Sequence, residues 1–231
     1  MKDFARLGTW SRILAVSVLL GVACAEPRGD GGDSDRTAPG QRHVSPPRPD
    51  TVHSTITIEG MDEPMTYWLY RSPPGFPLPF STYVPTDMAA GPVAAYEAEV
   101  IRFVAEFGGR RNEQVILAIA VLPEGVDQDA ALALARDVAE RAGARSTQTA
   151  PDRPRRFSWS VEEWTFTRRL PDGATAFGSA ALGVRYGRYF FVVTHFPGEY
   201  GDGFGPRAAR ILDEWRWEDT GEPLHSPGSG S

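Results

Sequence analysis

The residue with the most specific chemistry in this sequence is Cys24, because it is the only cysteine and therefore the only thiol. It follows an uncharged run, residues 13–23, and Lys2, Arg6 and Arg12 precede that run. A positive flank, a short apolar run and an exit of small residues predict a secretory signal peptide. The run is too short to span a bilayer as a helix, which takes roughly 20 apolar residues.

The four residues that end at Cys24, Gly21-Val22-Ala23-Cys24, resemble a bacterial lipobox, although Gly21 replaces the usual Leu. In a lipobox the cysteine thiol receives a diacylglycerol and the cysteine becomes the new N-terminus. The alternative is ordinary signal-peptidase cleavage after Ala23-Cys24-Ala25, which would give a secreted protein. We expect residues 1–23 to be a lipoprotein signal peptide and Cys24 to anchor the protein to a membrane of the cell envelope, on the periplasmic or outer-membrane side.

Catalytic groups are scarce in the rest of the chain. Lys2 is the only lysine, so Schiff-base catalysis, a phosphate-loop lysine and a Ser-Lys nucleophile pair are excluded from the chain after cleavage. His195 is the only histidine in the predicted fold, and a zinc site needs three or four ligands. Ser179 lacks the G-x-S-x-G spacing of a nucleophile elbow. We therefore predict no catalytic residue, no metal and no cofactor.

One glycine-rich segment, residues 198–205, precedes a predicted helix and is the candidate binding loop. Such loops can hold phosphate on backbone N–H groups, but Glu199 and Asp202 would repel an anion. A mobile loop that borders a binding surface fits better, with Glu199, Tyr200, Asp202 and Phe204 as the candidate binding residues.

Carboxylates leave one enzymatic alternative open. Glu162 and Glu163 lie on a predicted strand, and Glu199 lies in the glycine-rich segment. Two of them, facing each other within about 5–10 Å, would form the acid/base pair of a hydrolase. A third alternative is a carrier of small hydrophobic ligands, which would need an apolar cavity between sheet and helix.

The charge balance excludes one class of partner. The chain carries −6, and removal of residues 1–23 takes away three positive charges and one negative charge, which leaves −8. Affinity for nucleic acid comes mainly from neutralising phosphates, so we expect no nucleic-acid partner. Arg145, Arg153, Arg155 and Arg156 with Phe157 and Trp159 are interpreted as a solvated loop.

Composition divides the chain beyond Cys24 into a tether, a domain and a tail. Residues 24–53 are rich in Gly and Pro and almost free of large apolar residues, so we expect a disordered tether. Residues 54–219 form the folded domain, and residues 220–231 form a Gly/Ser/Pro tail without expected structure.

Within the domain, local patterns predict strands and two helices. Alternating or apolar runs bounded by turn residues predict strands at 55–58, 65–70, 80–85, 101–107, 115–122, 164–167, 174–184 and 189–195. One helix follows the N-cap Asp127, with Ala131 and Ala135 on its buried face, and the other starts near Pro206. The apolar run 115–122 predicts a central strand covered on both faces. We therefore predict a single α+β domain, with one antiparallel sheet and helices packed on both faces.

Four segments of the domain resemble the PsbP-like fold, which is shared by an extrinsic photosystem subunit, a Ran-binding import factor and many bacterial lipoproteins. The segments are Phe80-Ser81-Thr82-Tyr83-Val84-Pro85, the strand 115–122 that runs into the Asp127 helix, residues 187–194, and Ile211-Leu212-Asp213-Glu214-Trp215-Arg216-Trp217. The resemblance implies an α/β/α sandwich that binds protein partners or assists assembly without catalysis. No functional residue of the family maps onto this sequence.

Together these observations predict a lipid-anchored envelope protein with a non-catalytic binding or assembly domain and an envelope protein as its partner. The hydrolase and the carrier remain the alternatives.

Overall fold

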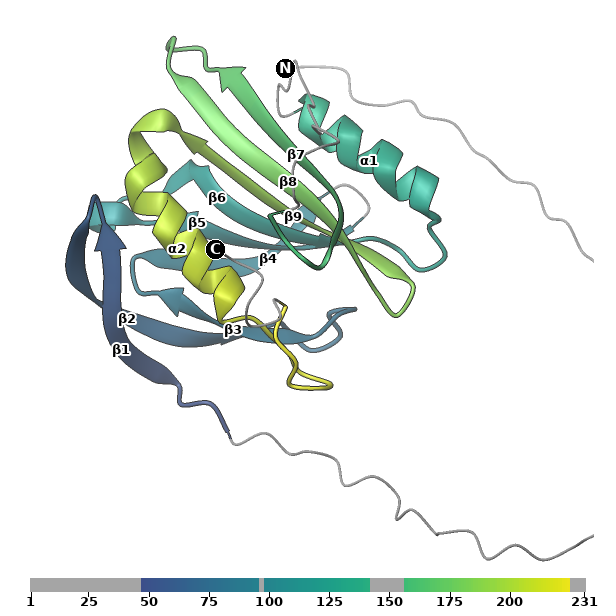
Figure 1. The fold of residues 1–231 in the computed structure, drawn as a ribbon, viewed down its shortest axis with the longest axis horizontal. Coiled ribbons are helices and arrows are strands. Elements are labelled where there is room, and N and C mark those ends of the chain that lie inside the picture. Colours follow the sequence, from purple (N-terminus) through teal and green to yellow (C-terminus); the bar gives the residue numbers. More distant parts are fainter. Residues whose placement is uncertain (1–46, 96–97, 142–155, 225–231) are drawn as a thin grey trace, which may run out of the picture. The chain divides into compact units, whose positions relative to one another are not determined.

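The computed structural model describes residues 47–95, 98–141 and 156–224, most of which lie in antiparallel strands (Figure 1). The strands form two sheets. The four-stranded sheet has the order β1 (Thr51–Ile58), β2 (Met61–Arg71), β3 (Phe80–Pro85), β10 (Arg216–Trp217). The six-stranded sheet has the order β4 (Met88–Ala95), β5 (Ala98–Ala105), β6 (Asn112–Val121), β9 (Arg188–Pro197), β8 (Thr175–Arg185), β7 (Ser160–Arg169).

Tight turns join consecutive strands where the sequence predicts them. Glu59 and Gly60 both have positive φ, at 51° and 79°, which is the backbone of a type I′ hairpin turn between β1 and β2. Tyr186 and Gly187 repeat this geometry between β8 and β9. In the β7–β8 turn, the Asp172 carboxylate accepts a hydrogen bond of 2.9 Å from the Ala174 N–H. Each of these turns joins two of the strands that the sequence pattern predicts.

The six-stranded sheet buries apolar side chains on both faces. On the inner face, alternate residues of β5, β6 and β9 join one core cluster with Phe80, Val84 and Trp215. On the outer face, Trp164, Leu182 and Phe191 form a second cluster with α1 (Gln128–Arg141). The central position of β6 is confirmed, but its outer-face side chains are only half-buried, so the cover of that face is incomplete.

Helix α1 begins where its predicted cap lies. The Asp127 carboxylate accepts a hydrogen bond of 2.8 Å from the Ala130 N–H, which satisfies one of the free donors of the first turn. Ala131 and Ala135 are buried against the outer face of the large sheet, as their spacing predicts.

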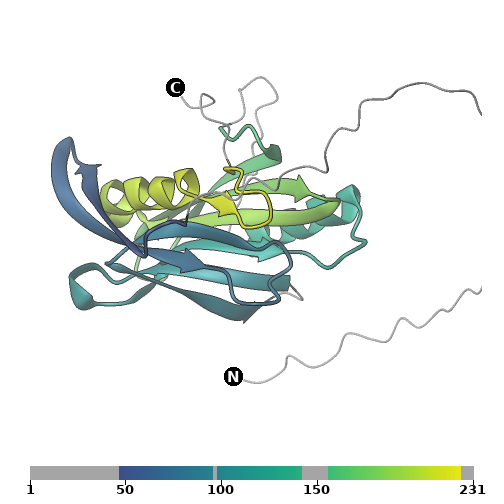
Figure 2. The same ribbon diagram turned by 90° about the horizontal axis from the view of Figure 1, so that it is seen from below.

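Helix α2 (Gly201–Asp213) begins earlier than predicted and contains Pro206 inside it. It packs against β1, β3 and β9, and the turned view in Figure 2 shows it beside the β1–β2 hairpin. A short 3-10 turn, η2 (Gly198–Tyr200), leads into it from β9. The prediction that the helix starts near Pro206 is therefore wrong by about one and a half turns.

The predicted α/β/α sandwich, with one antiparallel sheet and helices on both faces, is also wrong. The inner face of the large sheet is covered by the second sheet together with α2. The physical reason is that strands β2 and β3 carry enough aromatic and branched side chains, such as Tyr70, Phe80 and Val84, to bury this face without a second helical layer.

The ordered structure extends beyond residues 54–219 at both ends. β1 begins at Thr51, and Arg48 makes contacts with the domain that are described below. At the other end, Leu224 is buried, and its N–H donates a hydrogen bond to the Trp215 carbonyl.

Candidate functional site

The start of α2 is surrounded by four partly exposed aromatic side chains, which we call the aromatic rim: Phe107, Phe177, Phe196 and Tyr200. Phe107 lies in the 3-10 turn η1 (Phe107–Gly109), with its ring centroid 6.3 Å from that of Tyr200. Phe177 and Phe196 are neighbours across β8 and β9, with centroids also 6.3 Å apart. Phe177 is 43% exposed, which is unusual for a phenylalanine in a strand.

Two glycines in the turn before α2 let these rings lie against the backbone. A Cβ on Gly198 would come within 3.0 Å of the Phe177 ring, and one on Gly201 would come within 3.3 Å of the Phe196 ring. These two glycines therefore allow aromatic rings to pack closely against the backbone.

The four predicted binding residues separate into two groups. Glu199 and Asp202 are exposed, and both lie in the first turn of a helical segment, where a negative charge is favourable. Tyr200 belongs to the aromatic rim. Phe204 is fully buried and packs against Phe196 at 5.3 Å between ring centroids, so its side chain supports the rim from below.

Beneath the rim, an ion pair joins α2 to the turn between β3 and β4, and the same arginine contacts η1. Arg207 is only 7% exposed, and its Nε and Nη2 donate hydrogen bonds to the Asp87 carboxylate, the shortest of 2.6 Å. Its Nη1 donates to the Gly203 carbonyl at 2.6 Å, and its guanidinium lies 4.5 Å from the Phe107 ring centroid. This arrangement fixes Phe107 relative to the helix.

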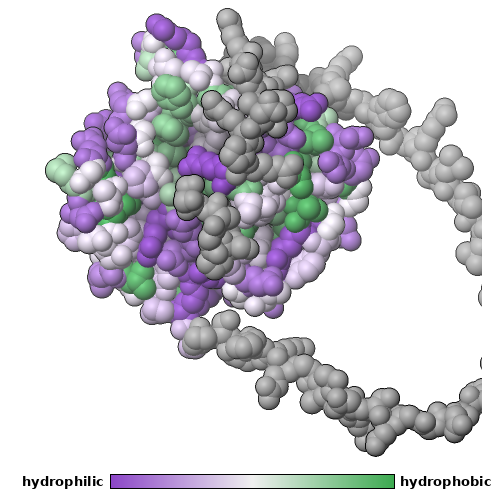
Figure 3. All heavy atoms as spheres, in the orientation of Figure 1, coloured by the Kyte–Doolittle hydropathy of each residue, from purple (hydrophilic) through white to green (hydrophobic). Residues whose placement is uncertain are grey.

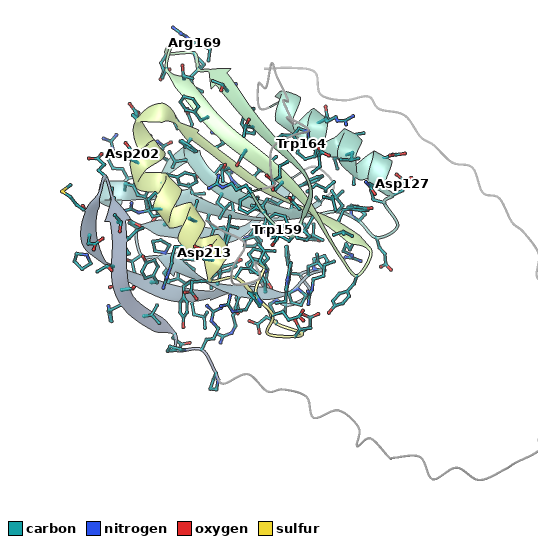
Figure 4. The ribbon with its side chains drawn as sticks, viewed as in Figure 1. Asp127, Trp159, Trp164, Arg169, Asp202 and Asp213 are labelled. Atoms are coloured by element: carbon teal, nitrogen blue, oxygen red, sulfur yellow. The ribbon has the colours of Figure 1, made fainter. Side chains whose placement is uncertain are left out.

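A second arginine ties the beginning of the described chain to the opposite end of α2. Arg48 Nη2 donates to the Glu214 carbonyl at 2.9 Å and pairs with the Glu214 carboxylate at 3.2 Å. Its Nη1 donates to Ser81, and its guanidinium lies 4.4 Å from the Tyr83 ring centroid. The chain therefore enters the domain at the C-terminal end of α2, while the rim lies at its N-terminal end, roughly 20 Å away for a helix of this length. Figure 4 labels Asp202 and Asp213 at these two ends.

Within the described residues, the hydroxyls of Tyr67 and Tyr70 are buried without a hydrogen-bond partner. Burial raises the pKa of Tyr70 to about 12. Burial also raises the pKa of Tyr67, against the opposing effect of Arg210 and Arg207 nearby. Both phenols are therefore protonated at neutral pH.

His195 does not meet a nucleophile. Its Nδ1 lies 2.7 Å from the Gln114 carbonyl oxygen, and its ring stacks on Phe166. Ser179 pairs with Thr194, the neighbour of His195 in β9, so the serine and the histidine point to opposite faces of the sheet. A Ser-His pair is therefore excluded at these positions.

The three carboxylates of the hydrolase alternative also lie apart. The Glu163 carboxylate accepts hydrogen bonds from the Phe157 N–H and the Ser160 hydroxyl, at 2.8 and 2.6 Å, and so stabilises the turn before β7. Glu162 is its neighbour in the strand and points to the other face. Glu199 lies beyond the far end of β9, roughly 20 Å along the strand direction, which is too far for a carboxylate pair.

Aromatic rings pack against one another between the two sheets. Phe80 and Trp215 stack at 3.6 Å between ring centroids, and Trp217 packs edge-on against both Trp215 and Phe190. Phe157 and Trp159 continue this stack onto Phe190, so these two residues of the predicted polar loop pack against the core.

Four predicted residues lie outside the described part of the chain: Cys24, the proposed lipid site, and the loop residues Arg145, Arg153 and Arg155. Among the residues that the structure does describe, no cluster of His, Cys, Asp and Glu has the composition of a metal site.

The predicted binding residues include Tyr200 of the rim but not Phe107, Phe177 or Phe196. Their assembly depends on long-range pairing, above all that of Ala176 with Pro197, which places the start of β8 beside η2. The spacing of Gly198 and Gly201 is the only local signal, because each allows a ring to approach the backbone.

The surface around the site is mixed in character. On the face that Figure 3 presents, small hydrophobic patches are separated by hydrophilic ones. One hydrophobic patch lies below the tip of the β7–β8 hairpin. In the described residues, neither helix has the length and apolar character needed to cross a bilayer. Comparison with protein-family models and with curated protein sequences found no match to this chain.

Proposed function

We propose that this chain is a lipid-anchored protein of the cell envelope whose domain is a non-catalytic binding module, with the aromatic rim as its contact surface. The observation that carries the proposal is the position of the rim: four partly exposed aromatic rings gather at the end of α2 opposite to the entry of the chain at Arg48. Exposed aromatic side chains are favoured at protein–protein contacts.

The geometry suits display from an anchor. Arg48 fixes the start of the described chain at the end of α2 opposite to the rim, so attachment through an earlier residue such as Cys24 does not begin at the rim. The residues between Cys24 and Pro47 are long enough for this: more than 20 residues of Gly- and Pro-rich sequence reach tens of ångströms.

The anchor is tested by fractionation. Wild-type protein is expected in the membrane fraction and the Cys24→Ala variant in the soluble envelope fraction. A wild-type protein that is already soluble would show that Cys24 carries no lipid.

The contact surface is tested by a matched pair of variants in β8. Phe177 and Val184 are 43% and 44% exposed and lie on the same strand, but only Phe177 belongs to the rim. Phe177→Ser is expected to lose the partner in a cross-linked pull-down from membranes, while Val184→Ser retains it. Equal recovery with both variants would overturn the assignment of the rim.

A further inference from the structure

Strand β1 is an outer strand of the four-stranded sheet, and in the described residues it pairs only with β2. The Leu69 N–H donates a hydrogen bond of 2.8 Å to the Asp50 carbonyl, so the backbone of residue 50 faces β2. In an antiparallel pair, the backbone groups of successive residues face alternately toward and away from the partner strand. The N–H and C=O groups of the even-numbered residues of β1 therefore bond to β2, and those of the odd-numbered residues point away from it. The N–H and C=O groups of Thr51, His53, Thr55 and Thr57 therefore face outward.

A second hydrogen bond agrees with this alternation. The Thr66 carbonyl, opposite His53 in the register, accepts from the Thr86 N–H at 3.0 Å and so faces away from β1. Four outward residues in one strand offer eight backbone donors and acceptors to a further strand.

The two outer strands of the six-stranded sheet, β4 and β7, carry features that block such pairing, whereas β1 carries none of these features. β4 contains Pro92 in its middle, and β7 has a bulge between Ser160 and Glu162 and ends in Arg168 and Arg169. β1 reads Thr-Val-His-Ser-Thr-Ile-Thr-Ile, with no proline, no charged residue and a regular register with β2. Threonine, valine and isoleucine are also strong strand formers.

The charge of the β1–β2 hairpin indicates what kind of strand fits. Residues 51–70 contain Glu59, Asp62 and Glu63 and no lysine or arginine. All three acids are exposed at the turn, next to Met61, which is 59% exposed. A partner strand that ends beside this turn gains from basic residues and from an apolar contact with Met61.

We propose that β1 accepts an extended segment of a partner protein as an added strand, and that this segment carries basic residues at the end that lies beside the β1–β2 turn. The proposal names the kind of partner and rests on the binding function proposed above, but not on the lipid anchor. A second copy fits less well, because antiparallel pairing of two β1 strands brings Asp50 of each copy toward Glu59 of the other.

The test uses the full chain and short synthetic peptides. Each peptide has eight alternating threonine and valine residues. One peptide carries two lysines at its N-terminus, and another carries them at its C-terminus. Two matched peptides carry glutamates in place of these lysines. One lysine peptide is expected to bind at least tenfold more tightly than its glutamate counterpart in fluorescence anisotropy at low salt, with the difference shrinking in 0.5 M salt.

Hydrogen exchange by NMR then identifies the mode of binding. The amides of His53, Thr55 and Thr57 are expected to exchange rapidly in the free protein and to become protected when the peptide binds, while Ser54 and Ile56 are protected throughout. Binding without new protection at the odd-numbered amides, or no binding, overturns the proposal. Protection of these amides in the free protein also overturns the proposal, because the edge of β1 would already be occupied. If the protection fades on dilution, a second copy of the chain covers the edge. If it persists at every concentration, other residues of the same chain cover it.

Three variants of one residue complete the test. Thr55→Pro removes an outward N–H, and proline is tolerated at such positions of edge strands, so the fold is expected to persist and peptide binding to be lost. Thr55→Lys keeps the backbone and repels the basic strand, so it is expected to weaken binding about tenfold. Thr55→Val is the control and binds as wild type. A Thr55 variant that loses the peptide but still recovers the partner in the cross-linked pull-down separates this proposal from that of the rim.

Discussion

Replacing Arg207 with methionine tests whether the ion pair beneath the rim stabilises the domain through its burial. The Arg207 and Asp87 side chains are 9% and 26% exposed, and the pair is 2.6 Å long. The Arg111–Glu113 pair on the surface has the same length, but its side chains are 49% and 57% exposed. The two pairs therefore share their shortest distance but differ in burial.

The expected cost of Arg207→Met is about 3 kcal/mol, because the substitution leaves the Asp87 carboxylate without its partner in a largely buried position. The value lies at the lower end of the range for broken buried pairs, since water still reaches part of the carboxylate. Arg111→Met is expected to cost no more than about 1 kcal/mol, because the surface pair is screened by solvent.

Unfolding in guanidinium chloride, followed by tryptophan fluorescence, measures both values. Trp215 is fully buried, so its emission reports the loss of the core. A double-mutant cycle with Asp87→Asn isolates the coupling between the two side chains. Equal losses for Arg207→Met and Arg111→Met, or a coupling near zero, would refute the reasoning that burial makes this pair strong.

Three further predictions concern stability. Gly178→Ala is expected to cost about 1–3 kcal/mol in the same assay, because the new Cβ would lie 2.6 Å from the Thr194 carbonyl oxygen. A Cβ on Gly205 in α2 would meet nothing within 4 Å, so Gly205→Ala is expected to stabilise the domain by up to about 1 kcal/mol. Tyr70→Phe is expected to stabilise by about 1 kcal/mol at neutral pH by removing an unpaired buried hydroxyl. Because the folded pKa of Tyr70 is raised to about 12, wild type loses stability as the pH rises from about 10 to 12, and urea unfolding at these pH values should show a smaller loss for Tyr70→Phe. Arg48→Gln is expected to cost about 1–2 kcal/mol and to speed proteolysis of the chain before β1, and an unchanged cleavage rate would show that Arg48 does not hold this segment.

Local signals in the sequence predict the elements whose reasons are local. The Asp127 cap, the Glu59-Gly60 turn, the alternation in β5 and the apolar run of β6 all follow from residue types at short range. β4 was missed because its Ala, Gly and Pro residues have weak strand preference, and its place in the sheet is set by pairing with β5.

The start of α2 illustrates how tertiary contacts override local preference. Gly201, Gly203, Gly205 and Pro206 all disfavour a helix, so the sequence predicts a loop there. The structure is helical because Phe204, Ala208 and Ile211 are buried on one side and Arg207 is held by Asp87. The layers of the fold and most of the rim were missed for the same reason, since both depend on which distant strands pair.

The direction of β1 has a mechanical consequence. The strand runs from the entry of the chain at Arg48 toward the end of α2 that carries the rim, with every residue from Thr51 to Ile58 registered against β2. A pull on the chain before residue 47, against a partner held at the rim, acts along the strand axis and loads the β1–β2 hydrogen bonds in shear. Bonds loaded in shear share the force and must break together, whereas a pull at right angles would peel them one at a time. The fold is therefore oriented to resist extension between the entry of the chain at Arg48 and the rim.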